Sequence, residues 1–261
     1  MSVCAVIPAA GRGSRLGIDR PKLLAPIADS LTIFDVLRDL LLEHVDHVCF
    51  IVSPGGQPAI CSALERSPAH RRMSVRVQEK PTGMGDAIFC GFDVWRQFDS
   101  ILVVWGDQVL LSPATVHGTL GVHSSYSGPR ITIPLTTVVS PYVQYDIDES
   151  QRLIRVRQRR EGNIMERKGL SDVGAFALST GGLANAWEEY LEKAVRGAVT
   201  GEINFLPFLP YLSRQAWRVL TFDVADPSEA RGINTPEDLR FARERLAPCA
   251  SGEGSCRVNH K

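Results

Sequence analysis

A glycine- and arginine-rich segment follows the first apolar run of the chain and has the residue types that bind phosphate. The run covers residues 3–7, and the segment after it reads Ala9-Ala10-Gly11-Arg12-Gly13-Ser14-Arg15. Glycines let the backbone approach an anion, and consecutive N–H groups in such a loop form an anion-binding concavity. Lys22 adds positive charge, and Pro21 restricts the backbone immediately before it. Because the segment matches neither the Walker pattern nor the full G-x-G-x-x-G pattern, we predict a phosphate-binding loop of another kind.

The elements around this loop indicate how it is positioned. Apolar runs predict strands over residues 3–7, 47–52, 74–78 and 101–105. Helices are predicted around residues 31–41, over 85–98 and over 236–246, where Thr235 caps the helix and Pro236 occupies its first turn. Fully apolar strands that alternate with helices are typical of parallel strands buried on both faces. We therefore expect an α/β protein with an open, helix-flanked, mainly parallel sheet, whose ligands bind at the carboxyl ends of the strands.

The middle of the chain has a different pattern. Residues 130–139, 142–148 and 153–158 are β-rich, and a hairpin turn is expected at residues 148–151. Strands and helices alternate again over residues 173–178, 184–195 and 217–222. We expect a single domain over residues 1–247, with a β-rich insert at about residues 130–170 and a flexible tail at 248–261.

Composition excludes several classes of protein. Lys and Arg total 29, as do Asp and Glu, so the chain lacks the broad positive field of a nucleic-acid-binding protein. No apolar stretch approaches 18 residues, and the first residues lack a basic segment, so neither a membrane span nor a signal peptide is expected. Six cysteines without a CxxC pair are expected to be reduced and mostly buried, in a cytoplasmic protein, although Cys249 and Cys256 could pair. An oligomer is possible but not indicated.

A longer string of residues carries a family resemblance. Ile7-Pro-Ala-Ala-Gly-Arg-Gly-Ser-Arg-Leu-Gly, followed by Arg20-Pro-Lys-Leu-Leu, resembles the signature of nucleotidyltransferases that make nucleotide sugars. The pattern is most similar to the uridyltransferase domain of N-acetylglucosamine-1-phosphate uridyltransferase, over residues 3 to about 246. The resemblance implies a Rossmann-like (GT-A type) nucleotidyltransferase fold. It also implies transfer of a nucleotidyl group from an NTP, with UTP favoured, to a sugar 1-phosphate or similar phosphomonoester, releasing pyrophosphate.

The resemblance also implies roles for residues on the nucleotide side. Nucleotide binding falls to Ala9, Ala10, Gly11, Arg12, Gly13, Gln78, Gly83 and Met84. A glutamine amide offers one acceptor and two donors, which suit the edge of uracil or thymine. Arg15 and Lys22 would act on the phosphates during catalysis. Asp107 and Asn234 would bind Mg²⁺, which favours oxygen ligands and keeps further positions for water and phosphate.

The acceptor side matches the family less well. Trp105, Gly174 and Glu202 lie in segments that resemble acceptor-binding ones. Three further positions, where the family binds the N-acetylglucosamine group through Gly, Glu and Asn, fall near Gln144, Gln158 and Asp172 and keep none of the family's residues. The nucleotide side is thus retained and the acceptor side altered, which leaves the acceptor open.

Alternating arginines at 155, 157 and 159 share one face of a predicted strand. One interpretation is a solvated face, and the other is a clamp for an acceptor with a further anionic group.

The implied reaction needs no general base, because a phosphate monoester is mostly dianionic at neutral pH. Four alternatives stay open: a cytidylyltransferase or a guanylyltransferase acting on a non-sugar phosphate, a metal-dependent glycosyltransferase, and a catalytically inactive sensor of nucleotide sugars. A glycosyltransferase would need a metal-binding Asp-x-Asp pair, but Asp146-Ile147-Asp148 is expected in a hairpin.

Overall fold

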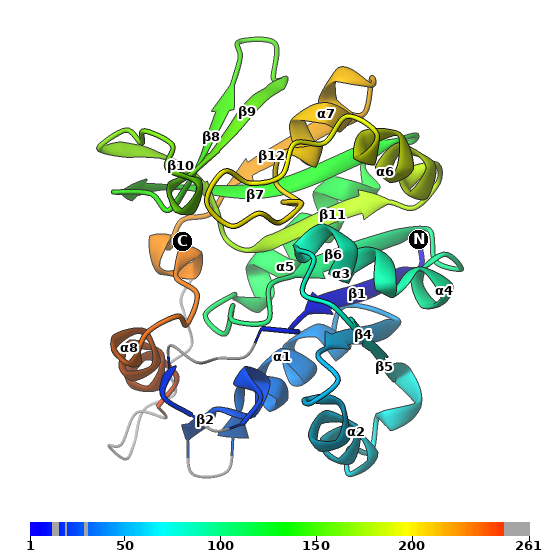
Figure 1. Cartoon of the computed structure of the whole chain (residues 1–261), viewed down its shortest axis with the longest axis vertical. Helices are drawn as coiled ribbons and strands as arrows, with labels where there is room; N and C mark the ends of the chain where they lie inside the picture. The colour runs from blue at the N-terminus through cyan, green and yellow to red at the C-terminus, as the bar shows by residue number, and fades with distance from the viewer. Residues whose placement is uncertain (12–15, 19, 29–30, 248–261) are drawn as a thin grey trace, which may run out of the picture.

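A mixed sheet forms the centre of the computed structural model, which describes residues 1–11, 16–18, 20–28 and 31–247 (Figure 1). Its strands run in the order β10-β7-β11-β6-β1-β4-β5, and β12 also pairs with β7. They are β1 (Val3–Pro8), β4 (His47–Val52), β5 (Met73–Val77), β6 (Ser100–Val104), β7 (Arg130–Val139), β10 (Lys168–Asp172), β11 (Ala175–Ser179) and β12 (Arg218–Asp223). The neighbours β6, β1, β4 and β5 are parallel, and β11 is antiparallel to both β6 and β7. The predicted α/β fold is therefore confirmed.

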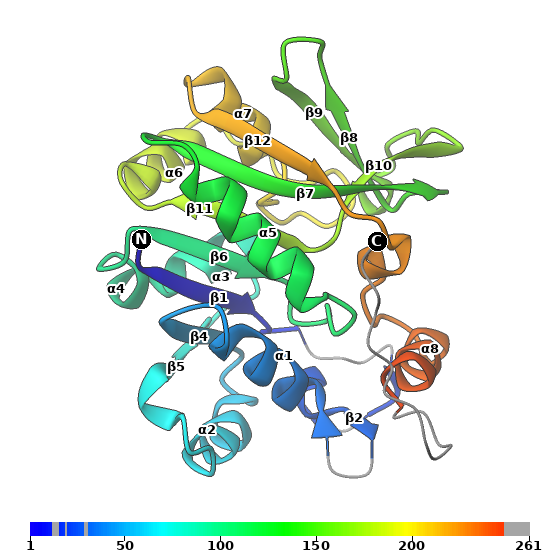
Figure 2. The ribbon, with the colours of Figure 1, turned by 180° about the vertical axis from the view of Figure 1, so that it is seen from behind.

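Helices cover both faces of this sheet. One face carries α1 (Ile33–Leu42), α2 (Gln57–Glu65), α5 (Pro113–Ser124) and α8 (Pro236–Leu246), of which α1 and α5 lie in front of the sheet in Figure 2. The other face carries α3 (Met84–Cys90), α4 (Phe92–Trp95), α6 (Leu183–Leu191) and α7 (Phe208–Arg214). Alternation along β1 explains the two layers, because Val3, Ala5 and Ile7 enter the first core while Cys4 and Val6 enter the second.

Several predicted elements have the expected bounds. The strands β4, β7 and β9 (Leu153–Gln158) and the helix α8 match the expected residues, and Thr235 caps α8 through its side chain. The expected helix over residues 85–98 is instead divided at Gly91, where a Cβ would lie 3.2 Å from Ile51 Cδ1. A side chain at this position would require the neighbouring side chains of the sheet to move by a few tenths of an ångström.

The β-rich region of residues 130–170 is divided between two sheets. The strands β7 and β10 join the main sheet, whereas β8 (Val143–Ile147) pairs with β9 in a separate hairpin that projects beyond it. A further small hairpin joins β2 (Pro26–Ala28) to β3 (Leu31–Thr32).

Two sequence expectations concern side-chain burial and membrane association. Cys4 and Cys49 are buried as expected, but Cys90 is exposed; Cys249 and Cys256 lie outside the described residues. In the part of the chain that the structure describes, no helix is both long and apolar enough to cross a membrane.

Candidate active site

The carboxyl ends of β1 and β6 lie side by side, because the two strands are parallel neighbours. Ala9, Ala10 and Gly11 follow β1, and Gly106 and Asp107 follow β6 one residue after its end. A Cβ at Gly106 would lie 3.0 Å from Ala9 Cβ and 3.1 Å from the Pro8 oxygen. Only glycine therefore lets these two strand ends meet without displacement. Arg12, Gly13 and Arg15 lie outside the described residues.

Lys22, Asp107 and Asn234 come together at this edge of the sheet. The Lys22 Nζ donates to Asp107 Oδ2 at 2.8 Å and to Asn234 Oδ1 at 3.4 Å. Lys22 belongs to a short 3₁₀ turn, η2 (Lys22–Leu24), and Asn234 directly precedes the cap of α8. Only 18% of the Lys22 side chain and 21% of the Asp107 side chain are exposed. The ammonium therefore joins a carboxylate and an amide oxygen in a partly desolvated place.

The start of α8 fixes the backbone at Asn234. The Asp238 carboxylate accepts from the Asn234 N–H at 3.0 Å and from the Thr235 N–H at 2.9 Å, in a capping box. The Ile233 N–H donates to the backbone carbonyl oxygen of Asp107 at 3.0 Å. A Cβ at Gly232 would lie 3.0 Å from Asp107 Cγ. These contacts explain how residues far apart in the sequence present their oxygens to one cation.

The donor set fits Mg²⁺. One carboxylate oxygen and one amide oxygen both contact the same positive charge, the Lys22 ammonium. Mg²⁺ binds through one or two protein oxygens and keeps water and phosphate as its other ligands. Across residues 1–11, 16–18, 20–28 and 31–247, no three His, Cys, Asp or Glu side chains gather as a metal cage. Asp107 and Asn234 are thus the residues that could hold this ion.

Gln78 and Gly83, which the sequence analysis assigns to nucleotide binding, lie after β5. Gln78 is buried, its N–H donates to the Val52 oxygen at 2.9 Å, and its Nε2 donates to the Gly83 oxygen at 2.9 Å. Gly83 has φ +132°, and a Cβ there would lie 2.4 Å from the Ile203 oxygen. Met84 then begins α3. The turn is therefore fixed by its own hydrogen bond and by close contact with Ile203.

Asp172, Gly174 and Trp105 lie next to Asp107. The Trp105 N–H donates to the Gly174 oxygen at 2.9 Å, and the Gly174 N–H donates to Asp172 Oδ1 at 2.7 Å. Burial raises the pKa of Asp172 to about 6, although the Gly174 N–H opposes this, and the negative charge of Asp107 adds to the rise. A buried carboxylate with a displaced pKa beside a cation site is typical of a functional position.

Two residues that the sequence analysis missed join this cluster. Gln108 and Tyr145 are buried, and neither Gln108 Oε1 nor the Tyr145 hydroxyl has a hydrogen-bond partner of normal geometry among the described residues. A Cβ at Gly174 would lie 2.3 Å from the Gln108 side chain, so the glycine makes room for it. The position of Gln108 directly after Asp107 is the signal that could have found it.

The remaining predicted acceptor residues lie elsewhere. Gln144 and Gln158 are buried in the β8–β9 hairpin, and Gln144 Oε1 accepts from the Glu166 N–H at 2.9 Å. Glu202 lies in the segment between α6 and α7, 3.9 Å from Arg160. In the described structure their side chains form no hydrogen bond or ion pair with Lys22 or Asp107, and their role in acceptor binding stays a prediction.

The arginines of the hairpin are engaged in ion pairs. Arg155 and Arg157 both bind Asp146, at 2.8 and 2.7 Å, whereas Arg159 follows the strand and donates to the Ser140 hydroxyl. Asp146 itself lies in β8, as expected of a hairpin carboxylate. Arg155 is therefore an exposed, paired arginine as the solvated-face interpretation expects, whereas Arg157 is paired but only 14% exposed.

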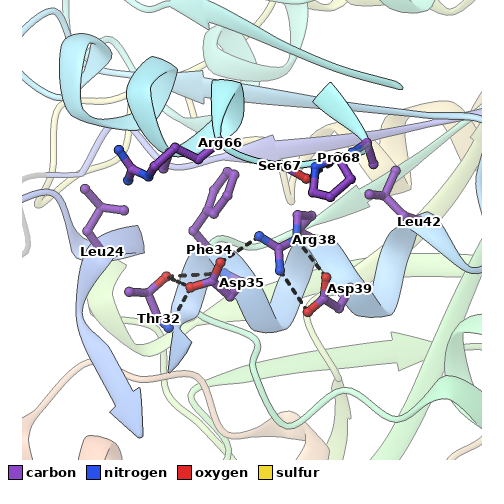
Figure 3. Close-up of a pocket in the computed structure, with 12 residues that line it drawn as sticks. Leu24, Thr32, Phe34, Asp35, Arg38, Asp39, Leu42, Arg66, Ser67 and Pro68 are labelled. Atoms are coloured by element: carbon purple, nitrogen blue, oxygen red, sulfur yellow. Dashed lines mark hydrogen bonds and ion pairs between the residues drawn. The ribbon is translucent and has the colours of Figure 1, made fainter. Parts of the chain in front are cut away.

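A pocket of about 460 Å³ is lined by α1, by the end of α2 and the residues after it, and by Leu24 of η2 (Figure 3). Three of its charged groups pair with each other, since Arg38 binds Asp35 and Asp39, both at 2.7 Å, whereas Arg66 donates to the Ser62 hydroxyl. Leu24 is the lining residue nearest in sequence to Lys22, and none of the predicted site residues lines this pocket.

Lys22, Asp107 and Asn234 meet at the edge of the sheet formed by the carboxyl ends of parallel strands, which is where ligands bind in open α/β folds. The model of the MobA-like NTP transferase domain matches residues 5–138, just over half of the chain. The chain therefore belongs to this family and is a nucleotidyltransferase.

Relatives and a solved structure agree with this family. The bifunctional protein GlmU of Aquifex aeolicus is 25% identical over 249 residues, which cover 90% of this chain and 51% of GlmU. A GlmU of Thermus thermophilus is 28% identical over 238 residues, covering 90% of this chain and 49% of that protein. The chain thus spans about half the length of these relatives. A putative glucose-1-phosphate thymidylyltransferase from Bacillus anthracis, in complex with a sucrose, has the same fold, with TM-score 0.75, 15% identity and coverage of 97% and 98%.

Proposed function

We propose that this protein transfers a nucleotidyl group from an NTP to a sugar 1-phosphate or a similar phosphomonoester and releases pyrophosphate. The observation that carries the proposal is the meeting of Lys22 with Asp107 and Asn234 at the strand ends, beside the glycine-containing loop. Such a site can bind a polyphosphate and a cation together. The family match and the GlmU relatives support the same reaction class.

The chemistry requires little beyond positioning and charge. The acceptor phosphate attacks the α-phosphorus in line with the departing pyrophosphate, and it needs no base because it is already mostly dianionic. Lys22 would contact both the α-phosphate and the acceptor phosphate, which lowers the repulsion between two polyanions. Arg15 and the N–H groups of residues 11–13 would hold the β- and γ-phosphates.

Asp107 and Asn234 would hold Mg²⁺, which when bound would neutralise charge on the α-phosphate oxygens. The Lys22 ammonium now contacts both of these side-chain oxygens. The ammonium has three N–H donors, so its third N–H is available to a phosphate oxygen while it keeps these two contacts.

The base is expected to be uracil. Gln78 Nε2 donates to the Gly83 backbone oxygen at 2.9 Å and to the Thr82 hydroxyl at 3.5 Å. If a base replaces the longer of these two contacts, that N–H and Oε1 together match a base edge that offers an acceptor next to a donor. Uracil and thymine offer this pattern, and UTP is the donor we favour.

Pyrophosphate release tests the proposal. The purified protein is incubated with Mg²⁺, with each of UTP, dTTP, CTP, GTP and ATP, and with a panel of sugar 1-phosphates and other phosphomonoesters. We expect a signal with UTP and one acceptor class, and a rate at least about 10²-fold lower with Asp107→Asn. Transfer of the sugar from a nucleotide sugar to an alcohol acceptor, without release of pyrophosphate, would instead show a glycosyltransferase.

A further inference from the structure

The segment between α6 and α7, residues 196–204, is a compact loop with internal hydrogen bonds. The Gly197 N–H donates to the backbone oxygen of Glu202 at 2.8 Å, and the Gly201 N–H donates to the backbone oxygen of Gly197 at 2.9 Å. Val199 is exposed to 69%. A loop with so exposed an apolar side chain needs attachment elsewhere to keep one position.

Glu161 supplies that attachment from η4 (Arg159–Glu161), just after the β9 strand. Its Oε1 accepts from the Thr200 hydroxyl at 2.7 Å and from Asn204 Nδ2 at 2.9 Å. Its Oε2 accepts from the N–H groups of Val199 and Thr200 at 3.1 and 3.5 Å. Only 8% of the Glu161 side chain is exposed. Burial alone would raise the pKa of Glu161, but the hydrogen bonds from Thr200 and Asn204 hold it at about 2, so it stays ionised.

The loop is shaped around this carboxylate. A Cβ at Gly197 would lie 2.5 Å from both carboxylate oxygens, so glycine alone admits Glu161 there. The neighbouring Arg160 binds the Asn204 side chain and lies 3.9 Å from Glu202. Charged groups from one short turn therefore hold the loop at several points.

The other end of the loop contacts the turn at Gly83. The Ile203 N–H donates to the Thr82 oxygen at 3.2 Å, and the Ile203 oxygen occupies the place of a side chain at Gly83. Gly83 in turn accepts the hydrogen bond from Gln78. The chain of contacts thus runs from Glu161 through the loop to the residues proposed to bind the nucleobase.

We propose that Glu161 is a positioning residue for nucleotide binding, which holds residues 196–204 against the turn at Thr82 and Gly83. The inference rests on the proposed function, because it takes that turn as the nucleobase site. Glu161 itself touches neither Gln78 nor Gly83 and acts through the loop. Loss of the carboxylate would free the loop, so that Ile203 no longer supports the turn.

Calorimetric binding of UTP with Mg²⁺ and without acceptor tests this inference. Glu161→Gln is compared with the wild type and with Glu166→Gln, which changes an exposed carboxylate that pairs only with Arg157 in the described structure. Loss of a charged acceptor shared by several donors predicts about tenfold weaker binding in Glu161→Gln. The control variant should bind as the wild type does. In turnover, KM for UTP should rise while kcat at saturation stays within about twofold.

A second variant protects the test against simple misfolding. Thr200→Val removes one donor to Glu161, and its effect on UTP binding should not add to that of Glu161→Gln, because both act through one contact. A lower Tm in the Glu161 variants with unchanged UTP binding well below Tm would show a structural role and overturn the inference. Absence of UTP binding by the wild type would instead refute the proposed function.

Discussion

Replacing Asp172 by Asn should stabilise the protein near neutral pH and leave its stability in acid unchanged. Asp172 is buried beside Asp107, and its Oδ1 accepts from the Gly174 N–H at 2.7 Å. An Asn side chain keeps an oxygen for that hydrogen bond and removes the charge. The substitution therefore removes the charge while this hydrogen bond is kept.

The size of the effect follows from the pKa of Asp172. Burial raises it from the ordinary 3.8 to about 6. Each pKa unit is worth about 1.4 kcal/mol, so the ionised carboxylate costs about 3 kcal/mol in the folded protein above pH 6. Because the folded pKa of Asp172 is raised, this group binds more protons in the folded than in the unfolded state between about pH 4 and pH 6, and its contribution to stability falls as pH rises through this window.

Urea unfolding between pH 4 and pH 8 measures this cost. The free energy of unfolding of Asp172→Asn should equal that of the wild type near pH 4, exceed it increasingly up to pH 6, and exceed it by about 3 kcal/mol above that. Glu149→Gln, on the exposed hairpin turn, is the control and should show no such gap. A gap that does not change with pH would refute the reasoning, because it would show that charge burial is not the cause.

Three further predictions concern the site. Lys22→Ala and Asp107→Ala should each lower kcat for pyrophosphate release by about 10²–10³, the cost of one preorganised charged group, and near-wild-type turnover would contradict the mechanism. Gly83→Ala should raise KM for UTP by roughly tenfold or more in steady-state assays, because its backbone is strained for other residues and a Cβ collides with the opposite backbone; an unchanged KM would count against the turn. Joint replacement of Arg155 and Arg157 by Ala should leave the KM for the acceptor unchanged, since both arginines already bind a carboxylate. An increased KM would instead support the interpretation that these arginines bind an anionic group of the acceptor.

Regular elements with strong patterns could be predicted from the sequence, and others could not. The β4 strand has the predicted bounds because its apolar run is continuous and buried. The helix α5 was not predicted, because its apolar residues do not gather on one face. Ser112, which caps α5, and Pro113 in its first turn were the available signals.

The site was predictable only where strand ends supply it. Asp107 could be placed because it follows an apolar strand, but Asn234 lies 127 residues further on and no spacing rule joins the two. Glu161 was missed because its partners lie 38 to 43 residues away in a loop without pattern. The structure places Gln144 in the β8–β9 hairpin, where it accepts from the Glu166 N–H, and its role in acceptor binding stays a prediction.

Transfer of the α-phosphate label tests the central claim most directly. The protein is given UTP labelled at the α-phosphorus, Mg²⁺ and the acceptor that supports pyrophosphate release. The account predicts that the label appears in a nucleotide-acceptor product joined through a diphosphate, with one pyrophosphate per product, and that Lys22→Ala forms it at less than about one hundredth of the wild-type rate. Label that stays in UTP, or that appears only in UMP without acceptor, would contradict nucleotidyl transfer at this site.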